Sequence, residues 1–280
     1  MASFFELCPV CGDARRSTVV AFPELTFSRC AGCGLIYKSQ QIPGLGHGYE
    51  EKFFLGGGAK YLRRWAHRVR KCRRQLQACL ELQPNAHALL DVGCSMGYVL
   101  AAARDLGLAA TGLDVSQFAV EACRTRGFEA VVGSATALPF PDAAFDLVML
   151  KAVLEHIPDP MAGLREAARV VRPGGVLFVV VPDGAYYKHT VFPRRGRDFR
   201  PDARGWQHHV YFDSRSFRRA CASAGLEVML EGRAVRRHRP GAALPAGLEA
   251  VRWAGLAAWG WASRTAHLRR DIQAFVGRRA

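Results

Sequence analysis

The chain has 280 residues, which is room for one large domain or for one domain with a small module. Half of the residues are apolar, as is typical of a soluble globular protein with a hydrophobic core. The formal net charge of +15 leaves two interpretations, a generally basic surface or attraction to an acidic partner such as nucleic acid, a phosphorylated substrate or an anionic membrane.

The sequence predicts no targeting or membrane-spanning segment. The first five residues have neither a basic region nor a long apolar run, so we expect no signal peptide and a cytoplasmic location. The most apolar late segment, residues 244–262, contains Glu249 and Arg252, so a buried or interfacial helix is expected there in place of a transmembrane one. Peripheral membrane contact stays open, and no feature predicts the oligomeric state.

Two Cys-x-x-Cys-Gly motifs lie in residues 1–40, with 18 residues between them. This spacing is typical of four-cysteine zinc sites, and each glycine permits the tight turn that directs two thiolates at one ion. We therefore predict a zinc ribbon-like module. Its structural Zn²⁺ would be held by Cys8, Cys11, Cys30 and Cys33, because four thiolates leave no open position. The other cysteines are expected to be small buried residues.

Residues 41–86 are predicted to form a glycine-rich linker followed by a helix from about residue 60 to residue 82. Basic side chains are spread around this helix, which favours a solvated surface over a stripe that binds phosphate, RNA or a membrane. They are Lys60, Arg63, Arg64, Arg68, Arg70, Lys71, Arg73 and Arg74.

Residues 87–280 alternate between strand-like and helix-like segments. Strands are predicted at 87–92, 109–113, 129–132, 145–150 and 176–181, and helices at 98–106, 117–126 and 161–170. This alternation predicts an α/β fold, a Rossmann-like parallel sheet with helices on both faces. Further along we expect a helix at 214–224 capped by Asp213 or Ser214, a strand at 226–230, a helical segment at 244–267 and a last strand at 272–276 on the sheet edge.

The first chemical motif is Asp91-x-Gly93-x-x-x-Gly97, directly after a predicted strand and before a predicted helix. Asp114 ends the next strand, 21 positions after Gly93, where a carboxylate can bind the two hydroxyls of a ribose. The alternative role for Asp114 is a helix N-cap. A nicotinamide dinucleotide is disfavoured, because the loop has only two glycines and the Asp91 carboxylate would repel a pyrophosphate.

Residues 87–232 resemble a class I S-adenosylmethionine (SAM)-dependent methyltransferase of the small-molecule type. The resemblance includes the loop at 90–97, Asp114, the segment 134–146 (SATALPFPDAAFD), Leu154-Glu155-His156-Ile157-Pro158-Asp159-Pro160, and Pro173-Gly174-Gly175. It implies a seven-stranded methyltransferase sheet. It also implies that Asp91, Gly93 and Gly97 surround the methionine part of SAM, that Asp114 binds the ribose, and that Ser134 and Ala135 lie beside the adenine.

Cys94, Val115 and Lys151 complete the cofactor site that the resemblance implies. Two positions depart from the family. Ser95 stands where the family usually has glycine, so it must tolerate the loop conformation. Ser134 stands where an acidic residue usually bonds the adenine amine.

The acceptor side is predicted in residues 182–212. The segment Trp206–Asp213 resembles the His-x-x-Tyr-Phe box of these methyltransferases, with His208, Tyr211 and Phe212 in its fixed positions. His208 is the first candidate for accepting a proton from the acceptor, with His156 second and Tyr211 lining the pocket. Alternatively, His208 only orders the loop. The loop arginines are candidate anchors for a phosphate or carboxylate: Arg194, Arg195, Arg197, Arg200 and Arg204.

The predicted function is transfer of a methyl group from SAM to an O, N or C atom of a small-molecule, sugar, glycan or natural-product acceptor. One alternative is an RNA methyltransferase whose zinc ribbon and basic surface hold RNA. Nucleic acid is not favoured, since Lys151-Ala152-Val153-Leu154 replaces the Asn-Pro-Pro-Tyr type of tetrapeptide after the fourth strand. A second alternative is a non-catalytic SAM-binding subunit.

Overall fold

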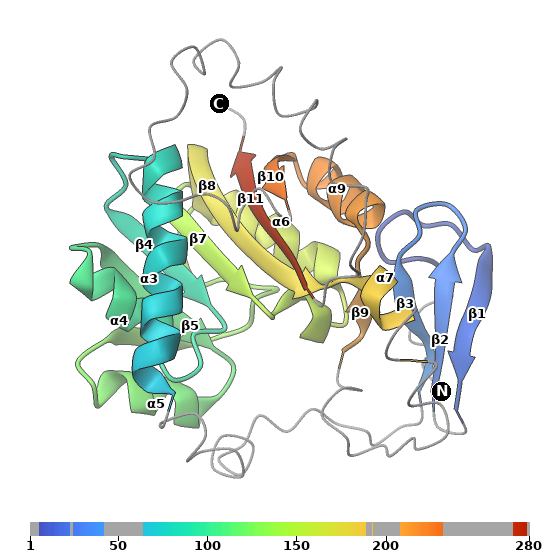
Figure 1. Cartoon of the computed structure of the whole chain (residues 1–280), viewed down its shortest axis with the longest axis horizontal. Coiled ribbons are helices and arrows are strands. Elements are labelled where there is room, and N and C mark those ends of the chain that lie inside the picture. The colour runs from blue at the N-terminus through green and yellow to red at the C-terminus, as the bar shows by residue number, and fades with distance from the viewer. Residues whose placement is uncertain are drawn as a thin grey trace.

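The computed structural model describes residues 6–22, 25–41, 64–188, 192, 208–231 and 271–278. The glycine-rich stretch, the start of the basic helix, the predicted helix at 244–267 and the loop arginines lie outside these residues. Within the described part, no helix has the length and apolar composition needed to cross a membrane. The described residues form one large sheet with helices around it and one small sheet beside it (Figure 1).

The large sheet has seven strands in the order β10-β11-β8-β7-β4-β5-β6. The strands are β4 (Ala88–Val92), β5 (Ala109–Asp114), β6 (Glu129–Val132), β7 (Phe145–Lys151), β8 (Val171–Pro182), β10 (Leu226–Glu231) and β11 (Asp271–Arg278). The strands from β4 to β8 are parallel, and β11 is antiparallel to both of its neighbours. This arrangement confirms the predicted fold class.

The prediction that the last strand lies on the sheet edge is wrong. β11 lies between β8 and β10, and Phe275 faces Phe178 on one side and Leu230 on the other. The reason is burial: Phe275 and Val276 are fully buried, and a strand buried on both faces belongs inside a sheet. β8 also begins earlier than predicted, since it includes the turn residues Pro173, Gly174 and Gly175 with a register shift against β7.

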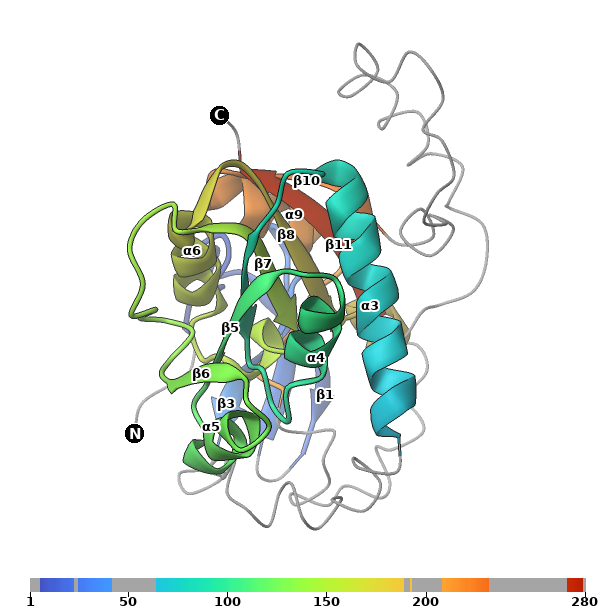
Figure 2. The same cartoon turned by 90° about the vertical axis from the view of Figure 1, so that its left-hand side faces the viewer.

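Helices cover both faces of the large sheet (Figure 2). They are α3 (Trp65–Leu82), α4 (Tyr98–Asp105), α5 (Gln117–Arg124), α6 (Pro160–Val170) and α9 (Ser214–Ser223). Two short helices follow strands of this sheet: the 3-10 helix η1 (Leu154–His156) comes after β7, and α7 (Gly184–Tyr186) comes after β8. Alternate strand residues separate the two faces. Leu89 and Phe178 pack in the cluster of α3 and α4, whereas their neighbours Leu90 and Val179 pack in the cluster of α6 and α9.

Helix α3 lies on the α4 face with its basic residues outward. It buries Cys72, Leu76 and Cys79. The residues Arg64, Arg70, Lys71, Arg73 and Arg74 are exposed. This exposure is consistent with a solvated helix. The cap of α9 is Asp213, not Ser214, because its carboxylate accepts the backbone N–H of Ser216 and the Ser216 hydroxyl accepts the N–H of Asp213.

The small sheet is built from β1 (Arg16–Ala21), β2 (Leu25–Cys30) and β3 (Ile36–Gln41), joined by β9 (Val210–Tyr211). β9 comes from the segment predicted as the substrate-side loop, and Tyr211 faces Ile36 across the pairing. The small sheet lies beside α7 at the end of the large sheet that carries β10 and α9 (Figure 1). Leu35 and Tyr37 belong to the same hydrophobic cluster as α6 and α9, so the two parts share a core.

Candidate cofactor and acceptor site

The glycine loop connects β4 to α4 and depends on left-handed backbone. Gly93 has a φ of 71°, and Gly97, the N-cap of α4, has a φ of 86°. A Cβ at Gly93 would lie 2.6 Å from Cγ2 of Val153, so the loop passes close to the end of β7. Ser95 has a φ of 51°, the conformation for which the family's glycine is suited. The expectation that Ser95 must tolerate the loop conformation is therefore confirmed.

Asp114 holds this loop in place from the end of β5. Its Oδ2 accepts the backbone N–H of Ser95 at 2.8 Å, and its Oδ1 accepts that of Ser116 at 2.9 Å. The N-cap of α5 is Ser116, whose hydroxyl accepts the N–H of Ala119, so Asp114 is not the cap. Burial raises the pKa of the Asp114 carboxyl, and the backbone hydrogen bonds oppose this rise.

Asp91 and Lys151 lie at the ends of the neighbouring strands β4 and β7. Asp91 is 3% exposed, and burial raises the pKa of its carboxyl to about 7, with Lys151 opposing the rise and Asp114 adding to it. The Lys151 ammonium donates to Sγ of Cys72 on α3 at 2.9 Å. The next residue, Ala152, has a φ of 59°. Left-handed non-glycine residues thus follow both neighbouring strands, Ser95 after β4 and Ala152 after β7. Such strained backbone is typical of a functional site.

The remaining predicted cofactor residues surround the ends of β5 and β6. Cys94 is buried, with its sulfur 4.0 Å from that of Cys123. Ala135 is buried, whereas Ser134 is exposed and its hydroxyl pairs with that of Thr136 at 2.8 Å. Only three large apolar residues are exposed in the described part of the chain, and Val115 (56%) and Val132 (44%) are two of them. The structure therefore places uncovered apolar surface next to Asp114.

On the predicted acceptor side, the two candidate histidines lie together. The rings of His156 and His208 are 4.7 Å apart and meet edge to face. The His208 ring also lies 6.2 Å from that of Tyr187 and 5.3 Å from that of Tyr211. Tyr211 is fully buried and packs against Tyr187 and Phe192. Its ring is thus part of the small sheet's aromatic core.

The sequence interpretation missed Glu155, which precedes His156 in η1. Its carboxylate is 1% exposed, and burial, with a smaller contribution from Asp271, raises its pKa to about 8. Ligand atoms of Glu155, His156 and His208 all lie within 4.8 Å of one another. The signal lay in the Leu154-Glu155-His156 motif, where the Glu-His pair is also compatible with a packing role.

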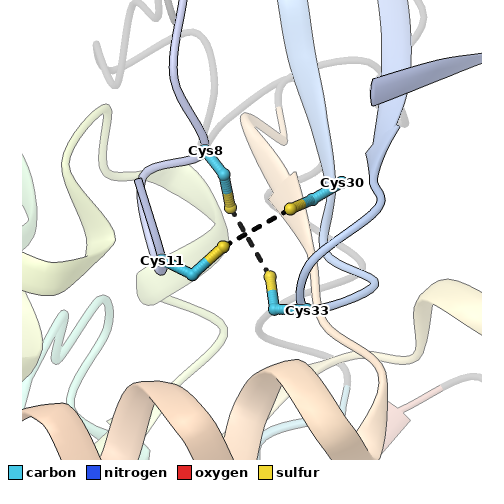
Figure 3. A group of neighbouring side chains, drawn as sticks. All are labelled: Cys8, Cys11, Cys30 and Cys33. Carbon is cyan, nitrogen blue, oxygen red and sulfur yellow. Dashed lines mark hydrogen bonds between the residues drawn. The ribbon is translucent and has the colours of Figure 1, made fainter. Parts of the chain in front are cut away.

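The four cysteines of the two Cys-x-x-Cys-Gly motifs converge on one point (Figure 3). The sulfurs of Cys8 and Cys33 are 3.5 Å apart, and those of Cys11 and Cys30 are 3.4 Å apart. These separations exclude disulfides, whose sulfurs are about 2.05 Å apart. They are close to the roughly 3.8 Å expected between thiolates on a tetrahedral Zn²⁺ with Zn–S bonds of about 2.3 Å. The arrangement fits a zinc ion.

Comparison with known proteins supports the interpretation of the glycine loop as part of a methyltransferase domain. A family model described as a methyltransferase domain matches residues 90–179. The 27-O-demethylrifamycin SV methyltransferase of Amycolatopsis mediterranei is 39% identical over 112 residues, which cover 35% of this chain and 40% of that protein. A demethylmenaquinone methyltransferase of Mycolicibacterium vanbaalenii is 39% identical over 108 residues, covering 38% of this chain and 46% of that protein. The match thus spans less than half of these relatives.

Solved structures extend the similarity to the fold of most of the chain. A chain in the complex of the Haloferax volcanii Trm112 methyltransferase activator with a putative methyltransferase superposes with a TM-score of 0.51 at 20% identity. The superposition covers 82% of this chain and 95% of that one. Residues 90–179 thus match a methyltransferase domain, and the chain shares the fold of this solved structure over most of its length.

Proposed function

We propose that this protein transfers a methyl group from SAM to an O, N or C atom of a small-molecule acceptor. The observation that carries the proposal is the pair of buried carboxylates, Asp91 and Asp114, at adjacent strand ends around a loop with left-handed Gly93, Ser95 and Gly97. Ligands of parallel α/β sheets bind outside the carboxyl ends of the strands. The matched methyltransferase domain supports SAM as the ligand.

The residues at these strand ends suit the parts of SAM. The Asp91 carboxylate, next to Gly93, Cys94 and Gly97, would hold the ammonium group of the methionine moiety, and a cation there would lower its raised pKa. The Asp114 carboxylate accepts backbone N–H groups of Ser95 and Ser116, and its two oxygens together have lone pairs left for a ribose hydroxyl.

The uncovered apolar surface next to Asp114 suits the adenine. Val115 and Val132 would pack against the base, with Ser134 and Ala135 at its edge. Lys151 stands at the end of β7 between the glycine loop and α3, where it balances the charge of Asp91.

When bound, SAM supplies an electrophilic methyl group. The chain's own task is then to position the acceptor, to exclude water and to receive a proton. His208 and His156 are the proposed proton acceptors, because their rings lie together between η1 and β9. The Tyr187 ring packs beside the His208 ring, and the Tyr211 ring of the small sheet contacts the His208 ring as well.

Small molecules are the acceptor class that the relatives favour, since the names of those proteins refer to a rifamycin and to menaquinone. The test is to incubate the protein with methyl-labelled SAM and separate fractions of small metabolites, glycans and RNA. Label in the small-metabolite or glycan fraction is the expected result. Label in RNA alone would favour the alternative function, and SAM binding without transfer to any fraction would favour a non-catalytic subunit.

We further propose that Cys8, Cys11, Cys30 and Cys33 hold a structural Zn²⁺. The sulfur separations support this role, and four thiolates fill the tetrahedral coordination shell of a structural zinc site. Cys30 and Cys33 belong to the same hydrophobic cluster as Phe217 of α9, so the ion would stabilise the contact between the two sheets. Measurement of one zinc per four-cysteine cluster in the purified protein tests the assignment.

A further inference from the structure

Three potential metal ligands outside the cysteine cluster come from two distant segments of the chain. Glu155 and His156 are consecutive in η1, and His208 directly precedes the residues that lead into β9. Their ligand atoms lie within 4.8 Å of one another. The backbone N–H of His209 donates to the carbonyl of Glu155 at 2.6 Å, so the main chain holds the two segments together.

One oxygen of the buried Glu155 carboxylate, Oε2, lacks a hydrogen-bond partner among the described residues. The residue is 1% exposed. No described lysine or arginine forms an ion pair with it, and the charged group that acts on it, Asp271, has the same sign. A buried carboxylate is costly unless it is protonated, paired with a cation or bound to a metal.

The two imidazoles next to this carboxylate provide the missing part of a binding site. His156 and His208 are half-buried and meet edge to face, with ring centres 4.7 Å apart. Two imidazoles and one carboxylate form a ligand set that suits first-row divalent transition metals. Metal–ligand bonds of about 2.1 Å would bring the ligand atoms to roughly 3 Å from one another, which side-chain rotation can achieve from the observed spacing.

We propose that Glu155, His156 and His208 bind a divalent transition-metal ion. Three protein ligands leave coordination positions open, in contrast to the closed four-cysteine set. The open positions would take an oxygen atom of the acceptor, and this part of the proposal rests on the proposed function. In the metal-bound protein each imidazole uses a ring lone pair on the ion, so His208 and His156 would hold the ion there, and their role as proton acceptors would apply only to the metal-free protein.

Binding is tested with Co²⁺ as the probe on the full-length, metal-depleted protein without SAM or acceptor. The expected result is two bound equivalents, one with the strong near-ultraviolet absorption of cobalt–thiolate bonds and one without it. The variants Glu155→Gln and His208→Ala should weaken the second equivalent on the order of tenfold or more and leave the thiolate band unchanged. His67→Ala is the matched control, because this exposed histidine of α3 lies outside the cluster.

The result that overturns the proposal is a single equivalent in the wild-type protein, or two equivalents that both persist in Glu155→Gln and His208→Ala. If Glu155→Gln does not fold, as judged by circular dichroism, the half-buried His208 still decides the question. Since the titration contains neither SAM nor acceptor, its result does not depend on methyl transfer. Transfer that continues at the wild-type rate in a variant lacking the second metal would overturn the acceptor role alone.

Discussion

The carboxylate of Asp114 accepts the backbone N–H of Ser95 at 2.8 Å, so the residue at the end of β5 fixes the loop that follows β4. The loop conformation and the proposed ribose contact therefore depend on one side chain. A substitution at Asp114 acts on both, whereas a substitution at Ser95 acts on the loop alone.

Replacing Asp114 with alanine is expected to lower SAM affinity on the order of 100-fold, because hydrogen bonds to a charged group contribute about 1.5 to 3 kcal/mol each. Asp114→Asn keeps one acceptor oxygen and should lose less. Isothermal titration calorimetry with SAM measures both changes. Val115→Ala is the control for a change beside the carboxylate, and it should lower the affinity for SAM less than Asp114→Ala does. Equal affinity of the wild type and Asp114→Ala for SAM would show that Asp114 is not part of the SAM site.

Replacing Ser95 with glycine is expected to stabilise the protein by about 1 kcal/mol, because a non-glycine residue at a φ of 51° is strained. Urea denaturation measures the change. Ala143→Gly is the matched control: its φ is 55°, but it lies in the turn before β7 and away from the glycine loop. Both variants should gain stability, and only Ser95→Gly should change SAM affinity. A loss of stability in Ser95→Gly would contradict the strain argument.

The sequence predicted the parallel sheet well because its strands are short, strongly apolar and followed by glycine or acidic residues at fixed spacing. The structure places Asp91, Gly93 and Asp114 at or directly after strand ends, as their sequence positions predict. The sequence did not predict β9, since a pair of residues that extends another sheet has no periodicity of its own. The contact of Lys151 with Cys72 on α3 was missed for a related cause, as 79 positions separate them.

The position of β11 shows another limit of sequence reasoning. Residues 272–276 are mostly apolar, which predicts a strand. Which strands it pairs with depends on tertiary packing, which the local sequence does not specify. Glu155 stands out only because its carboxylate is buried. The local sequence does not indicate whether a single carboxylate is buried, so this feature was missed. Its neighbour His156 was noticed only through the family motif.

Replacing Cys33 with serine is expected to remove one equivalent of zinc and to lower the midpoint of thermal unfolding on the order of 10 °C. The reason is that Cys33 joins the cysteine cluster to the core shared with α9. Elemental analysis and calorimetry measure the two effects. Cys221→Ala is the control, because this buried cysteine of α9 lies in the same core but outside the cluster, and it should retain the zinc. Full zinc content in Cys33→Ser would exclude the four-cysteine site.

The buried Lys38 of β3 predicts a pH dependence of stability. It is 2% exposed, and burial lowers the pKa of its ammonium from 10.5 to about 8. Lys38 faces Phe27 across the β2–β3 pairing, so its side chain points to the aromatic side of the small sheet. Folding there disfavours the charged form, because the described part of the chain provides no carboxylate in an ion pair with it.

Between pH 8 and 10.5 the unfolded chain binds more protons at Lys38 than the folded chain, so this group makes the protein more stable as the pH rises through that range. The gain is up to about 3 kcal/mol, at 1.36 kcal/mol for each unit of pKa. Lys38→Met should remove this dependence and should stabilise the protein most below pH 8. Urea denaturation of both proteins from pH 7 to 10.5 measures the difference, and comparing the two cancels the titration of the cysteines. Parallel pH profiles for Lys38→Met and wild type would mean that the ammonium is not desolvated in solution.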